Sequence, residues 1–184
     1  MIGVTPDRDR AHSESKKELV SVTIRPEYTF RGAGPLMTDS GRSRCEFEGK
    51  KLKVQVDITI SAHTDSISPV VEAVLALARE MKCAVGKEFE VETAVREALA
   101  NAIRHGCGDD SSKRVECCVA CDDAHGMLIV VRDPGPGFNP AGIPNPIVGE
   151  NIYSNHGRGI YLINQLMDEV RFERGGSEIH MRKG

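Results

Sequence analysis

The sequence predicts an α+β fold, a two-layer sandwich in which a mixed, mostly antiparallel sheet is covered on one face by about three helices. Two observations predict it. Apolar, strand-like segments follow one another at hairpin distance, which favours antiparallel pairing, and segments with helical periodicity lie between them. The expected order is strand, two helices, two strands, long loop, helix and two strands.

The first strand is expected over residues 52–60, where apolar and polar residues alternate and the apolar ones share one face. The first helix follows. Ser68 is a suitable N-cap and Pro69 a suitable first helical residue, because proline lacks an N–H that the first turn does not need. Apolar residues then recur at helical spacing, and Gly86 is expected to end the helix.

The second helix is expected from about Phe89 to His105, with Gly106 stopping it. Two strands are then predicted, at 114–121 and at 127–132, the latter a continuous apolar run. Residues 133–156 are rich in Pro and Gly and show little periodicity, so a long loop is expected there. Loops of that length are typically functional or disordered.

A third helix is predicted over 157–167, where apolar residues again recur at helical spacing. The last two strands are expected at 169–174 and 177–183. Gly175-Gly176 between them is typical of a two-residue hairpin turn, since both positions tolerate positive φ.

The length of 184 residues fits one domain with some chain to spare. Residues 1–50 are rich in charge, Gly, Pro and Ser, so we expect an N-terminal extension that is largely flexible and contains at most short ordered pieces. Residues 51–184 are the expected folded domain. Because the sequence ends at Gly184, directly after the last predicted strand, no further domain is expected.

Composition excludes several function classes. The net charge of −3 and the pI near 6.1 argue against direct nucleic-acid binding, which usually requires a strongly basic surface. No run of 18 apolar residues is present, so no membrane span is expected, and the polar N-terminus lacks a signal core. We expect a cytoplasmic protein.

The six cysteines are expected to be reduced thiols that pack as small hydrophobes. Cys117 and Cys118 are neighbours in a predicted strand and should point to opposite faces of the sheet. The spacing Cys118-x-x-Cys121 stands alone, whereas structural zinc normally takes four ligands, so zinc is not the favoured interpretation.

Three clusters of residues point to chemistry. The first is E-A-L-A-N-A-I-R-H-G, from Glu97 to Gly106. Glu97 and Asn101 lie one helical turn apart on one face, and Arg104 and His105 continue that polar side. A carboxylate and an amide oxygen so placed suit Mg²⁺ and its waters. The alternative is a helix face that simply meets water.

The second cluster, R-D-P-G-P-G-F, follows a buried strand directly. Asp133 could accept a hydrogen bond from an exocyclic amine such as that of adenine, while Gly135 and Gly137 let a flat ligand approach the backbone. The alternative is a tight turn with a solvated aspartate.

The third cluster is H-G-R-G-I-Y-L, in which Gly157, Arg158 and Gly159 open a helix. Exposed N–H groups and the helix dipole favour phosphate there, although a flexible hinge would look the same. Two familiar nucleotide motifs are absent from the sequence, the P-loop and the dinucleotide fingerprint G-x-G-x-x-G.

In order and spacing, the three clusters together resemble the Bergerat-fold (GHKL) ATPases, the superfamily of DNA gyrase B, heat-shock chaperones, MutL and sensor histidine kinases. Within it, the chain is similar to the anti-sigma factor serine/threonine kinases over about residues 50–183. The stretch E-A-L-A-N-A-I-R-H-G matches that subfamily's N box, D-P-G-P-G-F its first glycine box, and G-R-G-I-Y-L-I-N-Q-L-M-D-E-V its second.

The resemblance implies a role for each residue. Asn101 would be a Mg²⁺ ligand and Glu97 the general base. Asp133 would hold the adenine amino group, with Gly135 and Gly137 shaping that wall. The remaining residues would approach the phosphates: Gly157, Arg158 and Gly159, with Arg104 and His105 near them. Residues 138–156 would form the ATP lid.

The resemblance also implies a reaction and partners. The γ-phosphoryl group of ATP would pass to a serine or threonine of an anti-anti-sigma protein of the STAS fold, chiefly by positioning and charge neutralisation. Such proteins typically form homodimers and hold a sigma factor. The segment before the first strand contains only His12 and no pair of amphipathic helices, which disfavours a sensor histidine kinase. A non-catalytic ATP-binding module that acts by sequestering a partner stays open as an alternative.

Overall fold

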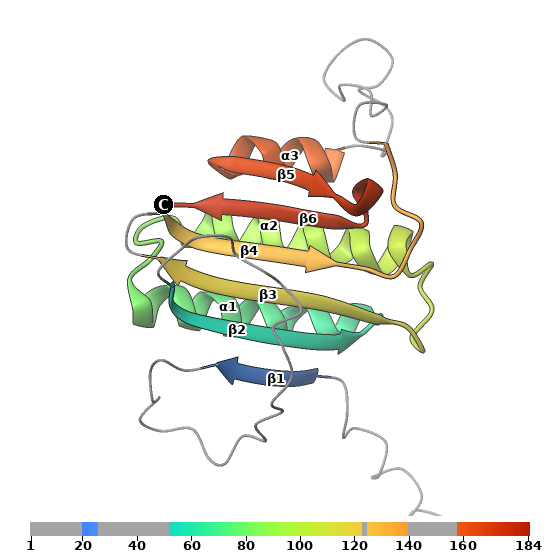
Figure 1. The fold of residues 1–184 in the computed structure, drawn as a ribbon, viewed down its shortest axis with the longest axis horizontal. Helices are drawn as coiled ribbons and strands as arrows, with labels where there is room; N and C mark the ends of the chain where they lie inside the picture. The colour runs from blue at the N-terminus through green and yellow to red at the C-terminus, as the bar shows by residue number, and fades with distance from the viewer. Residues whose placement is uncertain (1–19, 26–51, 123–124, 140–157) are drawn as a thin grey trace, which may run out of the picture.

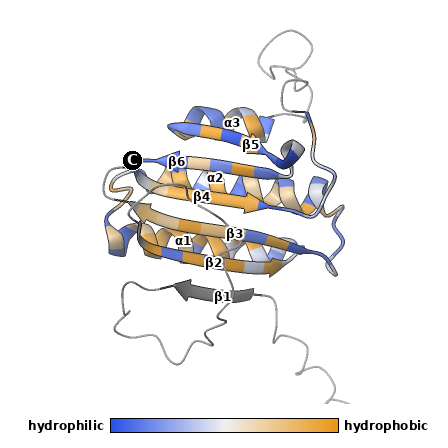
Figure 2. Ribbon diagram, in the orientation of Figure 1, coloured by the Kyte–Doolittle hydropathy of each residue, from blue (hydrophilic) through white to orange (hydrophobic). Residues whose placement is uncertain are grey.

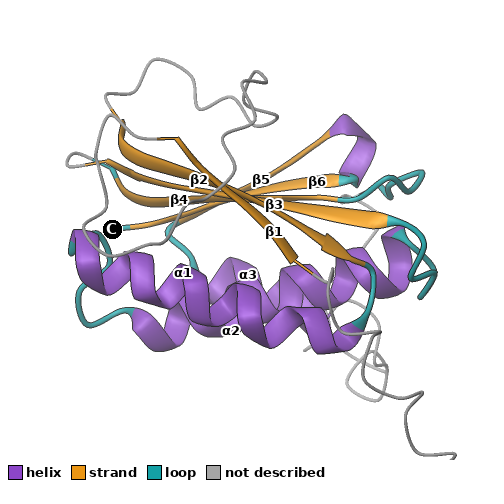
Figure 3. Ribbon diagram, turned by 90° about the horizontal axis from the view of Figure 1, so that it is seen from below, coloured by secondary structure: helices purple, strands orange, loops and turns teal. Residues whose placement is uncertain are grey.

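The computed structural model describes residues 20–25, 52–122, 125–139 and 158–184. Within these residues, one sheet has the strand order β1-β2-β3-β4-β6-β5, and every neighbouring pair is antiparallel. All three α-helices lie against the same face of this sheet, as Figures 1 and 3 show from two directions. The predicted two-layer α+β sandwich is confirmed, and the described strands contain no parallel pair.

From residue 52 onward, the element order follows the sequence-based prediction, whereas the first strand lies in the segment that was expected to be largely flexible. The strands are β1 (Val20–Arg25), β2 (Leu52–Ser61), β3 (Arg114–Asp122), β4 (Gly126–Arg132), β5 (Glu169–Glu173) and β6 (Glu178–Lys183). The α-helices are α1 (Ile67–Met81), α2 (Glu88–Asn101) and α3 (Arg158–Leu166). The expected long loop after β4 is described only as far as residue 139.

One apolar core lies between the sheet and the helices. Alternate residues of each central strand point into it, as the two-residue period of a strand requires. On β2 these residues are Val54, Val56, Ile58 and Ile60. Figure 2 shows the same concentration of hydrophobic residues along β2, β3 and β4. Cys117 belongs to this core, whereas Cys118 packs with Val130 on the other face, as predicted.

The first helix differs from prediction at both ends. It begins at Ile67 with Ser66 as N-cap, so Ser68 and Pro69 lie inside the first turn rather than at its cap. A 3₁₀ turn, Thr64–Ser66, precedes the helix, so the chain is already helical before Ser68, which was expected to be the N-cap. Pro69 is tolerated because a first-turn residue has no intrahelical N–H partner to lose. The helix ends at Met81, where Lys82 adopts left-handed geometry with φ of 53°, and Gly86 lies in the following turn.

The second helix is shorter than predicted and continues in a different form. α2 ends at Asn101, and a π-helical turn covers Ala102–Gly106. The N–H of Cys107 donates to the carbonyl of Ala102 at 2.8 Å, the i→i+5 bond of that turn. π-Turns of this kind frequently mark functional positions in helices.

The turn between β5 and β6 is longer than the predicted two residues. Glu173 pairs directly with Glu178, which leaves four residues in the loop. Arg174, Gly175 and Gly176 all have positive φ, and the hydroxyl of Ser177 donates to the carbonyl of Arg174 at 3.1 Å. The side chain of Ser177 therefore helps to close a turn that the glycine pair alone does not complete.

Residues 1–50, expected to be an extension with short ordered pieces, are described only over β1. This strand pairs with β2 along its whole length, from Val20 opposite Ile60 to Arg25 opposite Gln55. No α-helix among the described residues is long and apolar enough to cross a membrane.

The expectation that all cysteines are reduced is wrong for Cys83, Cys118 and Cys121, which are disulfide-bonded. Cys83, in the turn after α1, and Cys121, near the end of β3, form a disulfide with a Cα–Cα distance of 5.9 Å. Cys107 and Cys117 are buried free thiols. The sequence carries no signal for the pairing because the two residues are 38 positions apart and meet only when α1 packs on the sheet.

Candidate functional site

α2 presents its polar residues to a cavity beside the sheet. Glu97 and Asn101 are both half-buried and lie one turn apart, as predicted, while the opposite face of the helix enters the core. Arg104 and His105 follow on the π-turn and are exposed at the rim of the same cavity. A carboxylate and an amide oxygen therefore face a common space, with basic side chains beside them.

Asp133 lies immediately after β4 and is half-buried. Its Oδ1 accepts a hydrogen bond of 2.8 Å from the N–H of Gly135, and its own N–H donates to the carbonyl of Ser177 at 3.0 Å. Burial raises the pKa of its carboxyl group, and the Gly135 hydrogen bond opposes that rise in part. The first turn after β4 thus holds this carboxylate in a defined orientation.

Two glycines make room for that carboxylate. A Cβ atom on Gly106 would collide with the carboxyl group of Asp133, and one on Gly135 would lie 2.5 Å from the carbonyl oxygen of Gly106. The φ of Gly106 is not left-handed, so glycine is required there because a side chain would not fit, not because of the backbone conformation. The sequence predicts a helix stop at Gly106 and places it at the end of the first cluster, but its packing against Asp133 could not be foreseen from local pattern.

The start of α3 lies against the polar face of α2. A Cβ atom on Gly159 would lie 2.6 Å from Oε2 of Glu97 and 3.2 Å from Nδ2 of Asn101. Arg158 is exposed and lines the cavity with Gly159. Gly157, the other predicted phosphate-binding residue, lies outside the described residues. A helix N-terminus, a carboxylate and an amide therefore converge at this end of the cavity.

The opposite wall is formed by the segment after β4 and the β5–β6 turn. The rings of Phe138 and Phe172 meet edge to face, with centroids 5.3 Å apart and an interplanar angle of 73°. A Cβ atom on Gly137 would collide with the carbonyl of Gly175, and one on Gly176 with the carbonyl of Phe138. The two segments thus pack backbone against backbone.

These walls line a cavity of about 680 Å³ that takes residues from α2, α3, β4, β5 and β6. Every predicted site residue that is described lines it except Gly135, which instead supports Asp133. The lining also includes Phe138, at the start of the expected ATP lid, and residues for which the sequence predicts no role in the site: Ala98, Ala102, Gly106, Val131, Ile160, Ile163, Phe172, Gly176, Ser177 and Ile179. The apolar ones among them resemble ordinary core positions in sequence.

The cavity suits a nucleotide with a divalent cation. Its volume is that of a typical small-molecule site. One end offers the half-buried carboxylate of Asp133, which Gly106 and Gly135 accommodate because neither carries a Cβ. A carboxylate held in this way fits a flat base with an exocyclic amine. The other end offers Glu97, Asn101 and the start of α3, whose oxygen ligands and N–H groups fit Mg²⁺ and phosphates.

Comparisons with known proteins agree with this arrangement. A family model described as the histidine kinase-like ATPase domain matches residues 60–183. A curated protein of Clostridium novyi (strain NT), named anti-sigma F factor, is 27% identical over 138 residues, or 71% of this chain and 93% of that protein. A protein of the same name from Bacillus licheniformis is 25% identical over 143 residues, or 72% of this chain and 92% of that protein.

Proposed function

The chain belongs to the family of histidine kinase-like ATPase domains, and on that premise we propose that it is an ATP-dependent protein serine/threonine kinase. Its acceptor would be an anti-anti-sigma protein of the STAS fold, and the chain would also sequester a sigma factor. The observation that carries the proposal is the convergence of three separated segments, around Glu97, Asp133 and Gly159, on one cavity. ATP and Mg²⁺ would bind there.

Adenine recognition is assigned to the Asp133 end. The carboxylate, held by the Gly135 N–H, would accept a hydrogen bond from the exocyclic amine. Gly106 and Gly135 leave the space that this carboxylate and the Gly106 carbonyl fill, so the two glycines help to hold the adenine-binding side chain in place. Gly137 and Phe138 close the wall beside it.

The phosphates are assigned to the other end. The N–H groups at the start of α3, with Arg158 and Gly159, would contact them, and Arg104 and His105 stand at the rim. Asn101 would ligate Mg²⁺, which when bound would neutralise phosphate charge. Gly157 is proposed as a further contact from the sequence motif alone.

Glu97 is proposed as the general base. Its carboxylate would accept the proton of the attacking serine or threonine hydroxyl as the bond from that oxygen to the γ-phosphorus forms. The bond between this phosphorus and the bridging oxygen breaks, and ADP leaves. Glu97 faces the start of α3, where the γ-phosphate would lie, which suits this role.

The partners are proposed from the relatives' name. Both curated relatives are named anti-sigma F factor, which supports binding of a sigma factor and, with the sequence motifs, an anti-anti-sigma acceptor. A homodimer is proposed from the resemblance of the sequence motifs alone. This name says that the relatives act against a sigma factor but does not name a reaction. It is therefore equally compatible with a second candidate function, a non-catalytic ATP-binding module that sequesters a partner protein.

Labelled ATP separates the candidates. The full chain is incubated with γ-labelled ATP, Mg²⁺ and a STAS-domain partner from the same cell. Label on a serine or threonine of the partner supports the kinase, whereas nucleotide binding without transfer supports the sequestration module. Absence of any nucleotide-dependent thermal shift would remove both, because ligand at 100 times Kd should add about 2.7 kcal/mol of stability.

A further inference from the structure

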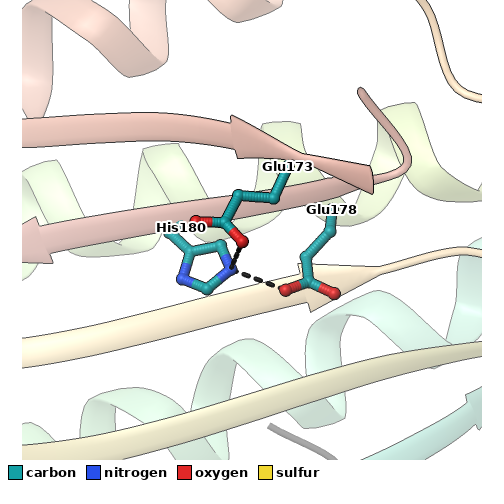
Figure 4. A group of neighbouring side chains, drawn as sticks. All are labelled: Glu173, Glu178 and His180. Atoms are coloured by element: carbon teal, nitrogen blue, oxygen red, sulfur yellow. Dashed lines mark hydrogen bonds and ion pairs between the residues drawn. The ribbon is translucent and has the colours of Figure 1, made fainter. Parts of the chain in front are cut away.

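A second cluster of ligand-type side chains lies on the face of the sheet opposite the helices. Glu178 and His180 are two residues apart on β6 and so share that face, and Glu173 on β5 is the direct cross-strand partner of Glu178. Figure 4 shows the three side chains turned toward one another. Nε2 of His180 is 2.6 Å from Oε1 of Glu178 and 4.0 Å from Oε2 of Glu173.

The charges of the cluster are unevenly compensated. Glu178 is only 5% exposed and forms ion pairs with Arg132 and, at 3.0 Å, with Arg174. Glu173 is exposed, and its one ion pair among the described residues is the long contact with His180. No arginine or lysine of the described chain pairs with Glu173, so a negative charge stands beside the imidazole without a permanent cation.

We propose that Glu173, Glu178 and His180 form a binding site for one divalent transition-metal ion, with Zn²⁺ the best match. Their candidate ligand atoms all lie within 4.8 Å of one another. One imidazole nitrogen and two carboxylate oxygens are three of the four ligands of a tetrahedral site that keeps a water in the fourth position. Mg²⁺ is disfavoured because it prefers an all-oxygen octahedron.

The geometry requires only small movements. Ligand atoms about 2.0–2.2 Å from a tetrahedral Zn²⁺ are roughly 3.3 Å apart. The contact between His180 and Glu178 would therefore open, and that between His180 and Glu173 would close, each by less than about 1 Å. The exposed side chain of Glu173 can make most of this adjustment by rotation. Arg174 is itself mostly exposed and can leave Glu178 when a cation arrives.

The alternative is that the three side chains form a polar network that needs no metal. The two interpretations differ in a measurable way, because only the metal site predicts saturable Zn²⁺ binding that is lost when one of the three side chains is replaced. This site is separate from the ATP cavity, and its test uses no nucleotide, so it stands or falls independently of the proposed kinase activity.

The experiment is a calorimetric titration of the full-length, untagged, chelator-treated chain with Zn²⁺ alone. One site is expected, and His180→Ala and Glu173→Gln should each weaken it at least tenfold. The matched control is His63→Ala, since His63 is also a histidine beside a carboxylate, 3.6 Å from Asp65, with no third ligand group near it among the described residues. This variant should bind as the wild type does.

Co²⁺ provides a second readout that excludes the cysteines. Bound at the proposed site, it should give visible d–d absorption without the near-ultraviolet charge-transfer band that a thiolate ligand adds. The proposal is overturned by no Zn²⁺ binding to the wild type, by unchanged affinity in Glu173→Gln, or by a thiolate band. Glu173 is exposed, so its substitution tests the site even where His180→Ala fails to fold.

Discussion

The α-carbon of Gly106 lies so close to the carboxylate of Asp133 that no side chain fits between them. Gly106 ends the π-turn after α2, and Asp133 begins the turn after β4, so this contact joins two of the segments that meet in the cavity. We therefore expect Gly106→Ala to displace Asp133 and to weaken ATP binding at least tenfold.

Gly108→Ala is the control for that substitution. A Cβ atom on Gly108 would meet nothing within 4 Å, but its φ of 67° is unfavourable for alanine. This variant should lose about 1–2 kcal/mol of stability while keeping its ATP affinity. Isothermal titration with ATP–Mg²⁺ and thermal unfolding measure both effects. Equal ATP affinity in Gly106→Ala and the wild type would contradict the proposed role of the contact.

Asp133→Asn tests adenine recognition directly. The substitution keeps the size of the side chain and removes the charge that would accept the amine hydrogen bond. Because a hydrogen bond to a charged group contributes about 1.5–3 kcal/mol, ATP affinity should fall by about 10- to 100-fold. Asp65→Asn, at an exposed position outside the cavity, should leave the affinity unchanged. An unaltered Kd in Asp133→Asn would remove this residue from the adenine role.

The raised pKa of Asp133 gives two pH effects of opposite sign. Between the ordinary pKa of an aspartate and this raised value, the folded chain without ligand holds a proton that the unfolded chain has released. Lowering the pH through that interval therefore stabilises the fold through this residue. ATP affinity should weaken over the same interval, because the protonated carboxyl group is a poorer acceptor. Titrations at several pH values should show this dependence in the wild type and a smaller one in Asp133→Asn.

Glu97→Gln should separate binding from chemistry. The variant fills the same space against Gly159 but cannot take a proton from the acceptor hydroxyl. Phosphoryl transfer should fall by about 100- to 10,000-fold while ATP affinity changes little. The matched control is Glu92→Gln on the same helix, because Glu92 is paired with Arg96 outside the cavity. Wild-type transfer by Glu97→Gln would rule out the general-base assignment.

Cys83→Ser tests the disulfide. The bond closes a loop of 38 residues, and the chain-entropy estimate for such a loop is about 4 kcal/mol. For a domain of this size, the midpoint of thermal unfolding should drop by about 10 °C. Cys117→Ala, at a buried free thiol, should cost only about 1 kcal/mol. Similar losses in the two variants would show that the Cys83–Cys121 bond contributes no more than ordinary packing.

From residue 52 onward, local pattern was sufficient to predict the element order and the positions of the strands, whereas β1 was not predicted. The alternation of apolar and polar residues predicted β2, and apolar residues at helical spacing predicted α2 and the start of α3. The ends of α1 were predicted wrongly. A 3₁₀ turn precedes the helix instead of an N-cap at Ser68, and the left-handed Lys82 ends it instead of Gly86. Such choices depend on how the helix meets the sheet, which propensity does not encode.

The candidate site was predicted where it rests on motifs and missed where it rests on tertiary packing. Glu97, Asn101 and Asp133 belong to conspicuous clusters and do line or border one cavity. Phe172 and Gly176 lie far along the chain in segments that resemble a plain strand and turn, so only the β4–β6 pairing brings them to the cavity. The Cys83–Cys121 disulfide was missed for the same reason.

The cavity wall made by Gly137 and Gly176 has a consequence for mapping experiments. Both glycines face main-chain atoms of the opposite segment, so at these two positions the wall consists of backbone. An alanine scan normally removes contacts, but at these two positions it would insert a methyl group where none fits. Losses recorded there would measure obstruction rather than the loss of a contact.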